Sequence, residues 1–130
     1  MDVIATQRFI RISPRKIRPI ANMVKDLSPT QAVKTLPYIG KRAAEPLAKV
    51  IKTALANAKA KGLKDKGLVF KEIQIGDGPR LKRGRWVAKG RWHPYQKRMS
   101  HIRVVLTAEP QASSGKLQTD SKGQNKKSKK

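Results

Sequence analysis

The sequence predicts an α+β fold: a three-stranded antiparallel sheet packed on three helices, with a long protruding β-hairpin. Three observations lead to this fold class. Segments near residues 3–12, 68–75 and 100–107 alternate apolar and polar residues, as half-buried strands do. Helical periodicity dominates the chain between the first two segments. A basic stretch, residues 78–98, separates the last two and contains no acidic residue.

The first strand is expected to run directly into a helix. Residues 3–12 mix β-branched and polar side chains, which favours a strand. Ser13 then suits an N-cap, and Pro14 suits the first helical position, where its missing N–H costs no hydrogen bond. Apolar residues follow at helical spacing, and Pro19 inside this helix is expected to remove one hydrogen bond and to kink it.

Two further helices are predicted before the second strand. Ser28-Pro29-Thr30-Gln31 has the form of a capping box, so a short helix should run from there to about Leu36, before Pro37. The clearest helical pattern runs from Arg42 to Lys61 and ends at Gly62. Its expected core stripe is Ala44, Leu47, Ala48, Ile51, Ala54, Leu55 and Ala58, and its cationic face carries Lys41, Arg42, Lys49, Lys52, Lys59 and Lys61.

The composition indicates a polyanionic partner. The 130 residues include 31 Lys and Arg but only 8 Asp and Glu, giving a formal net charge of +23. Such an excess repels itself unless a polyanion lies against it, and nucleic acid is the first candidate. The hydrophobic share of 38% is below the roughly 45–50% of ordinary domains, as expected if part of the chain joins no core.

Several other classes of protein are disfavoured. The chain has no cysteine, hence no disulfide, thiolate zinc site or cysteine nucleophile. The acidic residues are scattered without a close carboxylate pair, so we expect no catalytic residues, no metal site and no cofactor. No stretch reaches the ~18 apolar residues of a membrane helix, and a soluble, cytoplasmic chain is expected.

The basic stretch is the most informative segment. Unstructured connections longer than about 12–15 residues are usually either functional or disordered. Trp86, Trp92 and Tyr95 lie here among arginines, which favours RNA binding because aromatic rings stack on unpaired bases while cations meet phosphates. If both halves continue the flanking strands, the tip projects on the order of 30 Å at ~3.3 Å per residue. A two-stranded ribbon is marginal alone, so this arm is expected to gain a fixed shape only within RNA.

Several motifs resemble the bacterial large ribosomal subunit protein 22 family. They are Ser13-Pro14-Arg15-Lys16-Ile17-Arg18, Lys41-Arg42-Ala43-Ala44-Glu45-Pro46-Leu47, Ala54-Leu55-Ala56-Asn57-Ala58, Gly78-Pro79-Arg80-Leu81-Lys82-Arg83, Ala88-Lys89-Gly90-Arg91 and Arg98-Met99-Ser100-His101-Ile102. The similarity covers about residues 3–109. In the tip, Gly84, Trp86, Val87 and Trp92 depart from the family's usual pattern.

The resemblance implies a structural constituent of the large ribosomal subunit rather than an enzyme. Such a protein would bind several domains of large-subunit (23S-type) rRNA and assist its assembly. Its hairpin would line the peptide exit tunnel, beside the nascent peptide and beside ribosomal protein four at a constriction. We expect one RNA-binding domain over residues 1–109, with the hairpin extension at about 78–99, and a disordered basic tail over 110–130.

Charge, aromatic content and the matching motifs together give the candidate rRNA-binding residues. They are Arg11, Ser13, Arg15, Lys16, Arg18, Lys41, Arg42, Arg80, Lys82, Arg83, Arg85, Trp86, Lys89, Arg91, Trp92, His93, Tyr95, Lys97, Arg98 and His101. The basic residues of the first helix also fit a solvated face, but the lack of nearby acids favours phosphate contact. His101 also fits a structural histidine better than a metal ligand.

Two other function classes are compatible with the charge alone. A DNA-binding module would need a recognition element, and no basic zipper or zinc-finger spacing is found. A cationic membrane-surface protein would need more apolar area than the alanine face of the long helix offers, and that face has no Trp or Phe.

Overall fold

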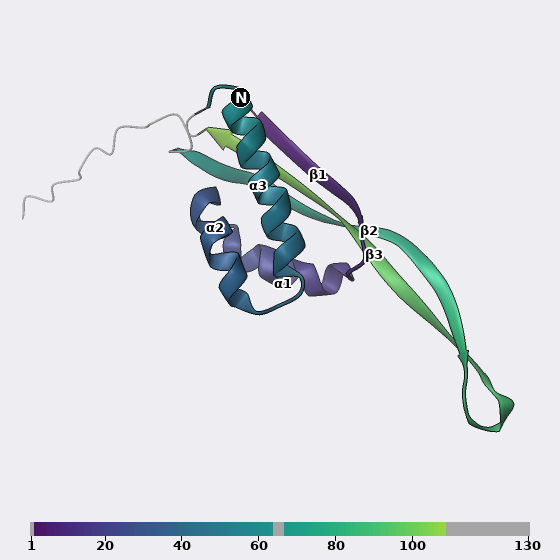
Figure 1. Cartoon of the computed structure of the whole chain (residues 1–130). Coiled ribbons are helices and arrows are strands. Elements are labelled where there is room, and N and C mark those ends of the chain that lie inside the picture. The colour runs from purple at the N-terminus through teal and green to yellow at the C-terminus, as the bar shows by residue number, and fades with distance from the viewer. Residues whose placement is uncertain (1, 64–66, 109–130) are drawn as a thin grey trace, which may run out of the picture.

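The computed structural model describes residues 2–63 and 67–108 and confirms the α+β class. The elements are β1 (Asp2–Ile10), α1 (Pro14–Val24), α2 (Pro29–Thr35), the 3-10 helix η1 (Leu36–Ile39), α3 (Ala44–Ala60), β2 (Leu68–Trp86), the 3-10 turn η2 (Ala88–Gly90) and β3 (Trp92–Ala108). They form a body of helices and sheet from which one hairpin projects (Figure 1). The tail predicted from residue 110 lies outside the described residues.

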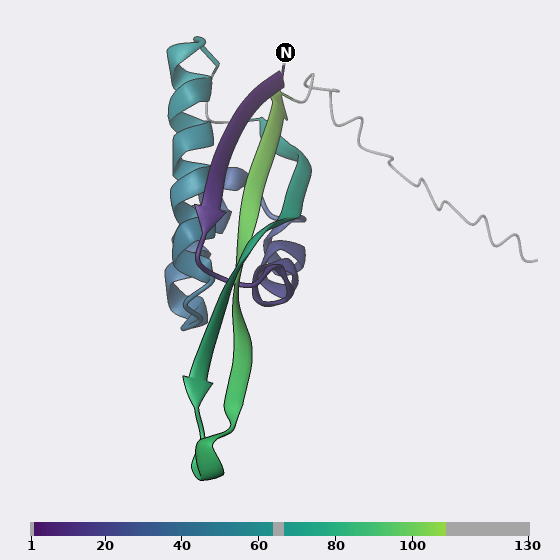
Figure 2. The ribbon, with the colours of Figure 1, turned by 90° about the vertical axis from the view of Figure 1, so that its right-hand side faces the viewer.

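The sheet has the order β1-β3-β2, and both pairs of neighbours are antiparallel. β3 is therefore central: Val3 pairs with Leu106 on one side, and Leu68 pairs with Ala108 on the other. The helices pack on one face of the sheet (Figures 1 and 2), so side chains along β3 alternate between the core and the opposite face.

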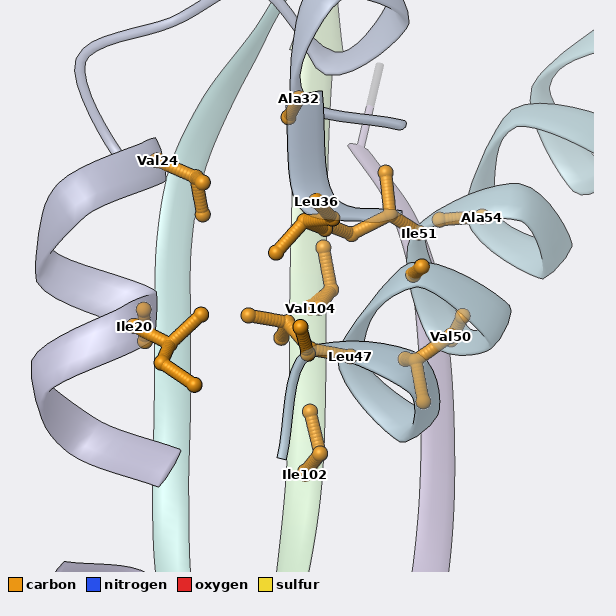
Figure 3. Close-up of a cluster of buried hydrophobic side chains, with 14 of the residues drawn as sticks. Ile20, Val24, Ala32, Leu36, Leu47, Val50, Ile51, Ala54, Ile102 and Val104 are labelled. Atoms are coloured by element: carbon orange, nitrogen blue, oxygen red, sulfur yellow. The ribbon is translucent and has the colours of Figure 1, made fainter. Parts of the chain in front are cut away.

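The core lies between this sheet face and the helices (Figure 3). Ile17 of α1, Leu47 and Ile51 of α3, and Ile102 of β3 are fully buried. The predicted stripe of α3 is confirmed, with Leu55 half-buried and its other members buried. Small side chains on α3 let it approach the sheet closely, and Asn57 donates a hydrogen bond to the Ile4 carbonyl of β1 at 3.2 Å.

The local helix signals are confirmed in part. The capping box is present: the Gln31 N–H donates to Ser28 Oγ, and the Ser28 N–H donates to Gln31 Oε1, each at 3.4 Å. Ser13 occupies the N-cap of α1, but its side chain makes no capping bond. α1 runs through Pro19 as one helix. α2 ends at Thr35, close to the predicted end near Leu36, and Pro37 lies in the first turn of η1, where its missing N–H costs no hydrogen bond.

Two element boundaries differ from expectation. α3 begins at Ala44, so Lys41 and Arg42 belong to the turn before the helix rather than to its cationic face. β1 ends at Ile10 instead of residue 12, because its register with β3 shifts between Gln7 and Ile10. Phe9, inside this irregularity, has a φ of 58°, in the left-handed region.

Candidate nucleic-acid interface

The basic stretch forms a paired β-ribbon, which we call the arm (residues 80–98). Its ladder runs from Arg80 opposite Arg98 to Trp86 opposite Trp92. The predicted long β-hairpin is thus confirmed: both halves continue the flanking strands, and the arm extends well past the helices (Figure 1). The ladder shifts register between Asp77 and Arg80, where Pro79 has no N–H to donate.

The arm is cationic over its whole length. Its eight cations are Arg80, Lys82, Arg83, Arg85, Lys89, Arg91, Lys97 and Arg98, and it contains no acid. All eight side chains are exposed. Within residues 2–63 and 67–108, no ion pair involves any of them. Arg80 also faces Arg98 across the ladder, and like charges in this position are destabilising unless an anion intervenes.

The end of the arm is ordered by its two tryptophans. The Trp86 and Trp92 rings meet edge to face, with centroids 5.0 Å apart and planes at 68°. The Trp92 ring also lies directly over the backbone of Gly84, since a Cβ on Gly84 would be only 1.8 Å from it. Val87 N–H donates to the Arg91 carbonyl at 2.9 Å and closes the turn. Both tryptophans remain largely exposed, at 74% and 54%.

The remaining aromatic candidates flank this pair on β3. His93 lies opposite Arg85, and Tyr95 lies opposite Arg83. Both are exposed. Each of these residues thus pairs with an arginine on the neighbouring strand, so that the ribbon presents rings and cations together for stacking and phosphate contact.

The root of the arm joins the basic residues of α1. Arg15 and Arg18 line a hollow of about 190 Å³ together with Arg80 and Arg98. Asp77 is the acid in this lining, and its Oδ1 accepts a hydrogen bond from Arg18 at 3.3 Å. Arg18 also reaches the Ile75 carbonyl at 3.4 Å. The fold therefore brings together two cationic segments more than sixty residues apart in sequence.

A second, larger groove adjoins the start of α1. It has a volume of about 850 Å³ and is lined by Arg11, Lys16, Lys41 and Arg42, with apolar side chains between them. Ser13 lines both this groove and the hollow at the arm root. Apart from His101, the candidates of the body therefore form one surface around the N-terminus of α1, continuous with the arm.

His101 does not belong to that surface. Its Nδ1 accepts a hydrogen bond from the Phe9 N–H at 3.0 Å, and the two rings meet at 85° with centroids 5.0 Å apart. This places His101 on the sheet face opposite the helices, beside Arg8 and Arg103, two arginines that are not among the predicted rRNA-binding residues. The alternation of buried Ile102 and Val104 along β3 is a signal that could have placed Arg103 on this face, but the bend at Phe9 has no sequence signal.

Other acids are engaged away from this interface. The Lys71 ammonium hydrogen-bonds Asp2 and lowers the pKa of that carboxyl, and Lys49 does the same to the pKa of Glu45, at 2.6 Å. In the part of the chain that the structure describes, no cluster of three or more His, Asp or Glu side chains is placed to hold a metal ion. No helix among the described residues is long and apolar enough to span a bilayer.

Comparisons with known proteins agree on one family. Residues 5–107 match the family described as "Ribosomal protein L22p/L17e". The "Large ribosomal subunit protein uL22" of Thermotoga sp. (strain RQ2) is 46% identical over 103 residues, which cover 78% of this chain and 65% of that protein. The proteins of the same name from Desulfatibacillum aliphaticivorans and Desulfitobacterium hafniense (strain Y51) are 41% and 40% identical. These alignments cover 82% and 78% of this chain, and 98% and 90% of the relatives.

Proposed function

Because the chain belongs to the ribosomal protein L22p/L17e family, a family of structural and non-enzymatic proteins of the large ribosomal subunit, we propose that it binds large-subunit rRNA through its arm and the adjoining surface of α1. The observation that carries this proposal is the arm itself: eight exposed cations on a paired ribbon without an acid or a core of its own. The mutual repulsion of these cations is relieved where a polyanion neutralises their charge from outside.

Affinity in this proposal comes mainly from phosphates. The exposed Arg and Lys side chains of the arm, of the hollow at its root and of the groove beside α1 displace counterions condensed on RNA. Arginine dominates near the root, and its planar fork can hold two phosphate oxygens at once. These phosphate contacts position the protein on the RNA but do not recognise a base sequence. Side chains cannot read base edges in the deep, narrow major groove of A-form RNA.

Specificity comes from shape and stacking. The arm is long and narrow enough to enter a crevice of folded RNA, and it presents Trp86, Trp92, His93 and Tyr95 near its end. Exposed rings of this kind stack on splayed bases in junctions and loops. We further infer that the arm lines the peptide exit tunnel, near ribosomal protein four and the nascent peptide, and that the protein assists rRNA assembly.

The contribution of the arm can be tested by removing two of its charges. The full chain carrying Arg83→Gln and Arg85→Gln should bind large-subunit rRNA more weakly, and the slope of log K against log salt should fall by about 2. The matched control removes two exposed lysines, one at the C-cap of α1 and one in α2, with Lys25→Gln and Lys34→Gln. Equal losses in both variants would show that only the net charge matters and would refute a specific role of the arm.

The tunnel assignment needs a separate readout. A photo-crosslinker attached at Lys89, in the turn of the arm, should label nascent chains in stalled ribosomes that contain this protein. A crosslinker at Lys34 on α2 provides the control. Labelling of nascent chains from Lys34 but not from Lys89 would contradict the proposed orientation.

A further inference from the structure

We propose that the sheet face opposite the helices carries a second RNA-binding site, in which an unpaired base stacks on Phe9 while Arg8 and Arg103 hold the adjoining phosphates. The site is separate from the arm and from the surface around α1. It rests on the proposed function only in taking RNA as the ligand.

The site is a shallow hollow of about 610 Å³ built by all three strands. Thr6 of β1 and Gln74 of β2 both pair with Arg103 of β3, and Gly76 of β2 pairs with His101. Their side chains, with those of Arg8 and Phe9, line the hollow. Because Gly76 has no side chain, the floor beside His101 stays open; the nearest atom to a Cβ there would be His101 Cβ at 3.9 Å.

The backbone at Phe9 adopts a left-handed conformation that is unfavourable for an aromatic residue. A φ of 58° is easy for glycine and accessible to asparagine, but it is unfavourable for a bulky aromatic residue. The bend is not required for burying the ring, which is 60% exposed. Strain of this kind persists where the surroundings impose it, and it concentrates at functional positions.

His101 holds the bend in place. Its Nδ1 accepts the Phe9 N–H, and its ring packs edge-on against the Phe9 ring. In the neutral imidazole the acceptor nitrogen carries no proton, so Nε2–H is left as a donor. The pair therefore offers a flat apolar surface beside a hydrogen-bond donor, which suits a base that has left its stack.

The charge of the hollow selects for a polyanion. Two exposed arginines, Arg8 and Arg103, line the hollow together with the Phe9–His101 pair, and no acid belongs to this lining. The described residues provide no ion pair for either guanidinium. Glu72 of β2 lies outside the lining, where its Oε1 accepts a hydrogen bond from Gln74 Nε2 at 2.6 Å, and the Asp2–Lys71 pair lies at the far end of the strands. A protein partner would need an acidic surface, whereas RNA supplies both the phosphates and the base.

The strained position allows an unusual test. Phe9→Gly removes the ring but suits the backbone, so its melting temperature should equal or exceed that of the parent chain. Its affinity for large-subunit rRNA should nevertheless fall roughly tenfold, the loss expected for one stacked base. Phe9→Asn, which also tolerates this backbone, should behave in the same way.

The arginines are tested with a charge-matched control in the same assay. Arg8→Gln with Arg103→Gln should weaken rRNA binding more than Lys25→Gln with Lys34→Gln, and should lower the salt slope by about 2. In assembled large subunits, p-benzoylphenylalanine in place of Phe9 should crosslink to an rRNA nucleotide.

The outcomes separate this inference from the proposed function. If the arm variant Arg83→Gln with Arg85→Gln loses affinity for rRNA while both Phe9 variants bind as the parent chain does, the second site is refuted. The proposed role of the arm is then supported. A crosslink from position 9 to a protein instead of rRNA would also overturn it. If the Phe9 variants lose affinity but the arm variant does not, the second RNA-binding site is supported and the proposed role of the arm in rRNA binding is refuted.

Discussion

Gly84 lies where a neighbouring ring leaves no room for a side chain. Because a Cβ there would overlap the Trp92 ring, Gly84→Ala should displace Trp92 and break its edge-to-face contact with Trp86. The measurement is the pair of indole N–H signals by NMR, which should shift, together with the coupled tryptophan bands in near-ultraviolet circular dichroism. Stability should change by less than about 0.5 kcal/mol, because the tip joins no core. Gly76→Ala is the control, because a Cβ at Gly76 would be 3.9 Å from its nearest neighbour, His101 Cβ. This variant should leave both spectra unchanged.

Ser100 is a buried polar residue within the central strand. Its Oγ donates to the Ile12 carbonyl at 2.9 Å and ties β3 to the connection between β1 and α1. Ser100→Ala should lower the free energy of unfolding by about 1–2 kcal/mol, through the lost bond and a poorly satisfied carbonyl. Denaturant titration measures this change. Thr53→Ala removes a comparable hydrogen bond to the Lys49 carbonyl on the exposed face of α3 and should leave the free energy of unfolding nearly unchanged. Equal losses of unfolding free energy in the two variants would argue against a special role of Ser100.

Two exposed carboxyls give a small dependence of stability on pH. Because Lys71 and Lys49 lower the pKa values of Asp2 and Glu45 in the folded chain, their contribution is complete above the ordinary pKa values. It is lost as the pH falls through the lowered values, below about pH 4. The Asp2→Asn, Glu45→Gln double variant should therefore show a flatter stability curve between about pH 5 and 2, measured by urea unfolding. An unchanged curve would contradict this assignment.

At the scale of single residues, the sequence predicts some features of the site but not others. Trp86 and Trp92 were selected as candidates from composition, but their mutual contact and the need for Gly84 depend on a register that only the folded ladder sets. Phe9 and the neighbouring arginines were not selected, because a local change of φ leaves no trace in an otherwise regular alternation of side chains.

At the level of elements, two serines occupy equivalent N-cap positions with different chemistry. Ser28 completes a capping box with Gln31, whereas the side chain of Ser13 caps nothing. Ser28→Ala should therefore cost about 1 kcal/mol of stability, and Ser13→Ala clearly less. Thermal unfolding of the two variants provides a direct comparison. If Ser13→Ala lost more stability than Ser28→Ala, the side-chain hydrogen bonds at the two N-caps would not explain the contributions of these serines to stability.

The helices and strands were predictable to different degrees. The α3 stripe and the capping box of α2 follow from local spacing, which the tertiary structure leaves unchanged. Strand alternation in the sequence covers residues 68–75, and the Gly76-Asp77-Gly78-Pro79 that follows gives no local signal that the strand continues. In the structure, pairing with β3 carries the strand through these residues with a register shift, and Gly78 lets the backbone approach Met99 closely.

At the scale of the whole molecule, the body and the arm should be separable. Among the residues that the structure describes, every buried hydrophobic side chain lies outside residues 79–99. Replacing residues 80–98 by a short glycine-containing turn should therefore leave the unfolding free energy of the body within about 1 kcal/mol, since no core contact is lost. Calorimetry of the shortened chain measures this, and rRNA affinity should fall strongly in parallel. A shortened chain that no longer unfolds cooperatively would refute the separation.

The position of β3 has a consequence for the order in which the chain can fold. β1 is hydrogen-bonded to β3 alone in this sheet, and Val3 finds its partner Leu106 only 103 positions later. At typical synthesis rates of about 5–20 residues per second, the first strand waits roughly 5–20 s for its neighbour. Until then the helices have no sheet to cover, and every prematurely terminated product exposes the apolar side of α3. Completion of the sheet is consequently a late event in the synthesis of the chain, and such long-range strand pairing is intrinsically slow.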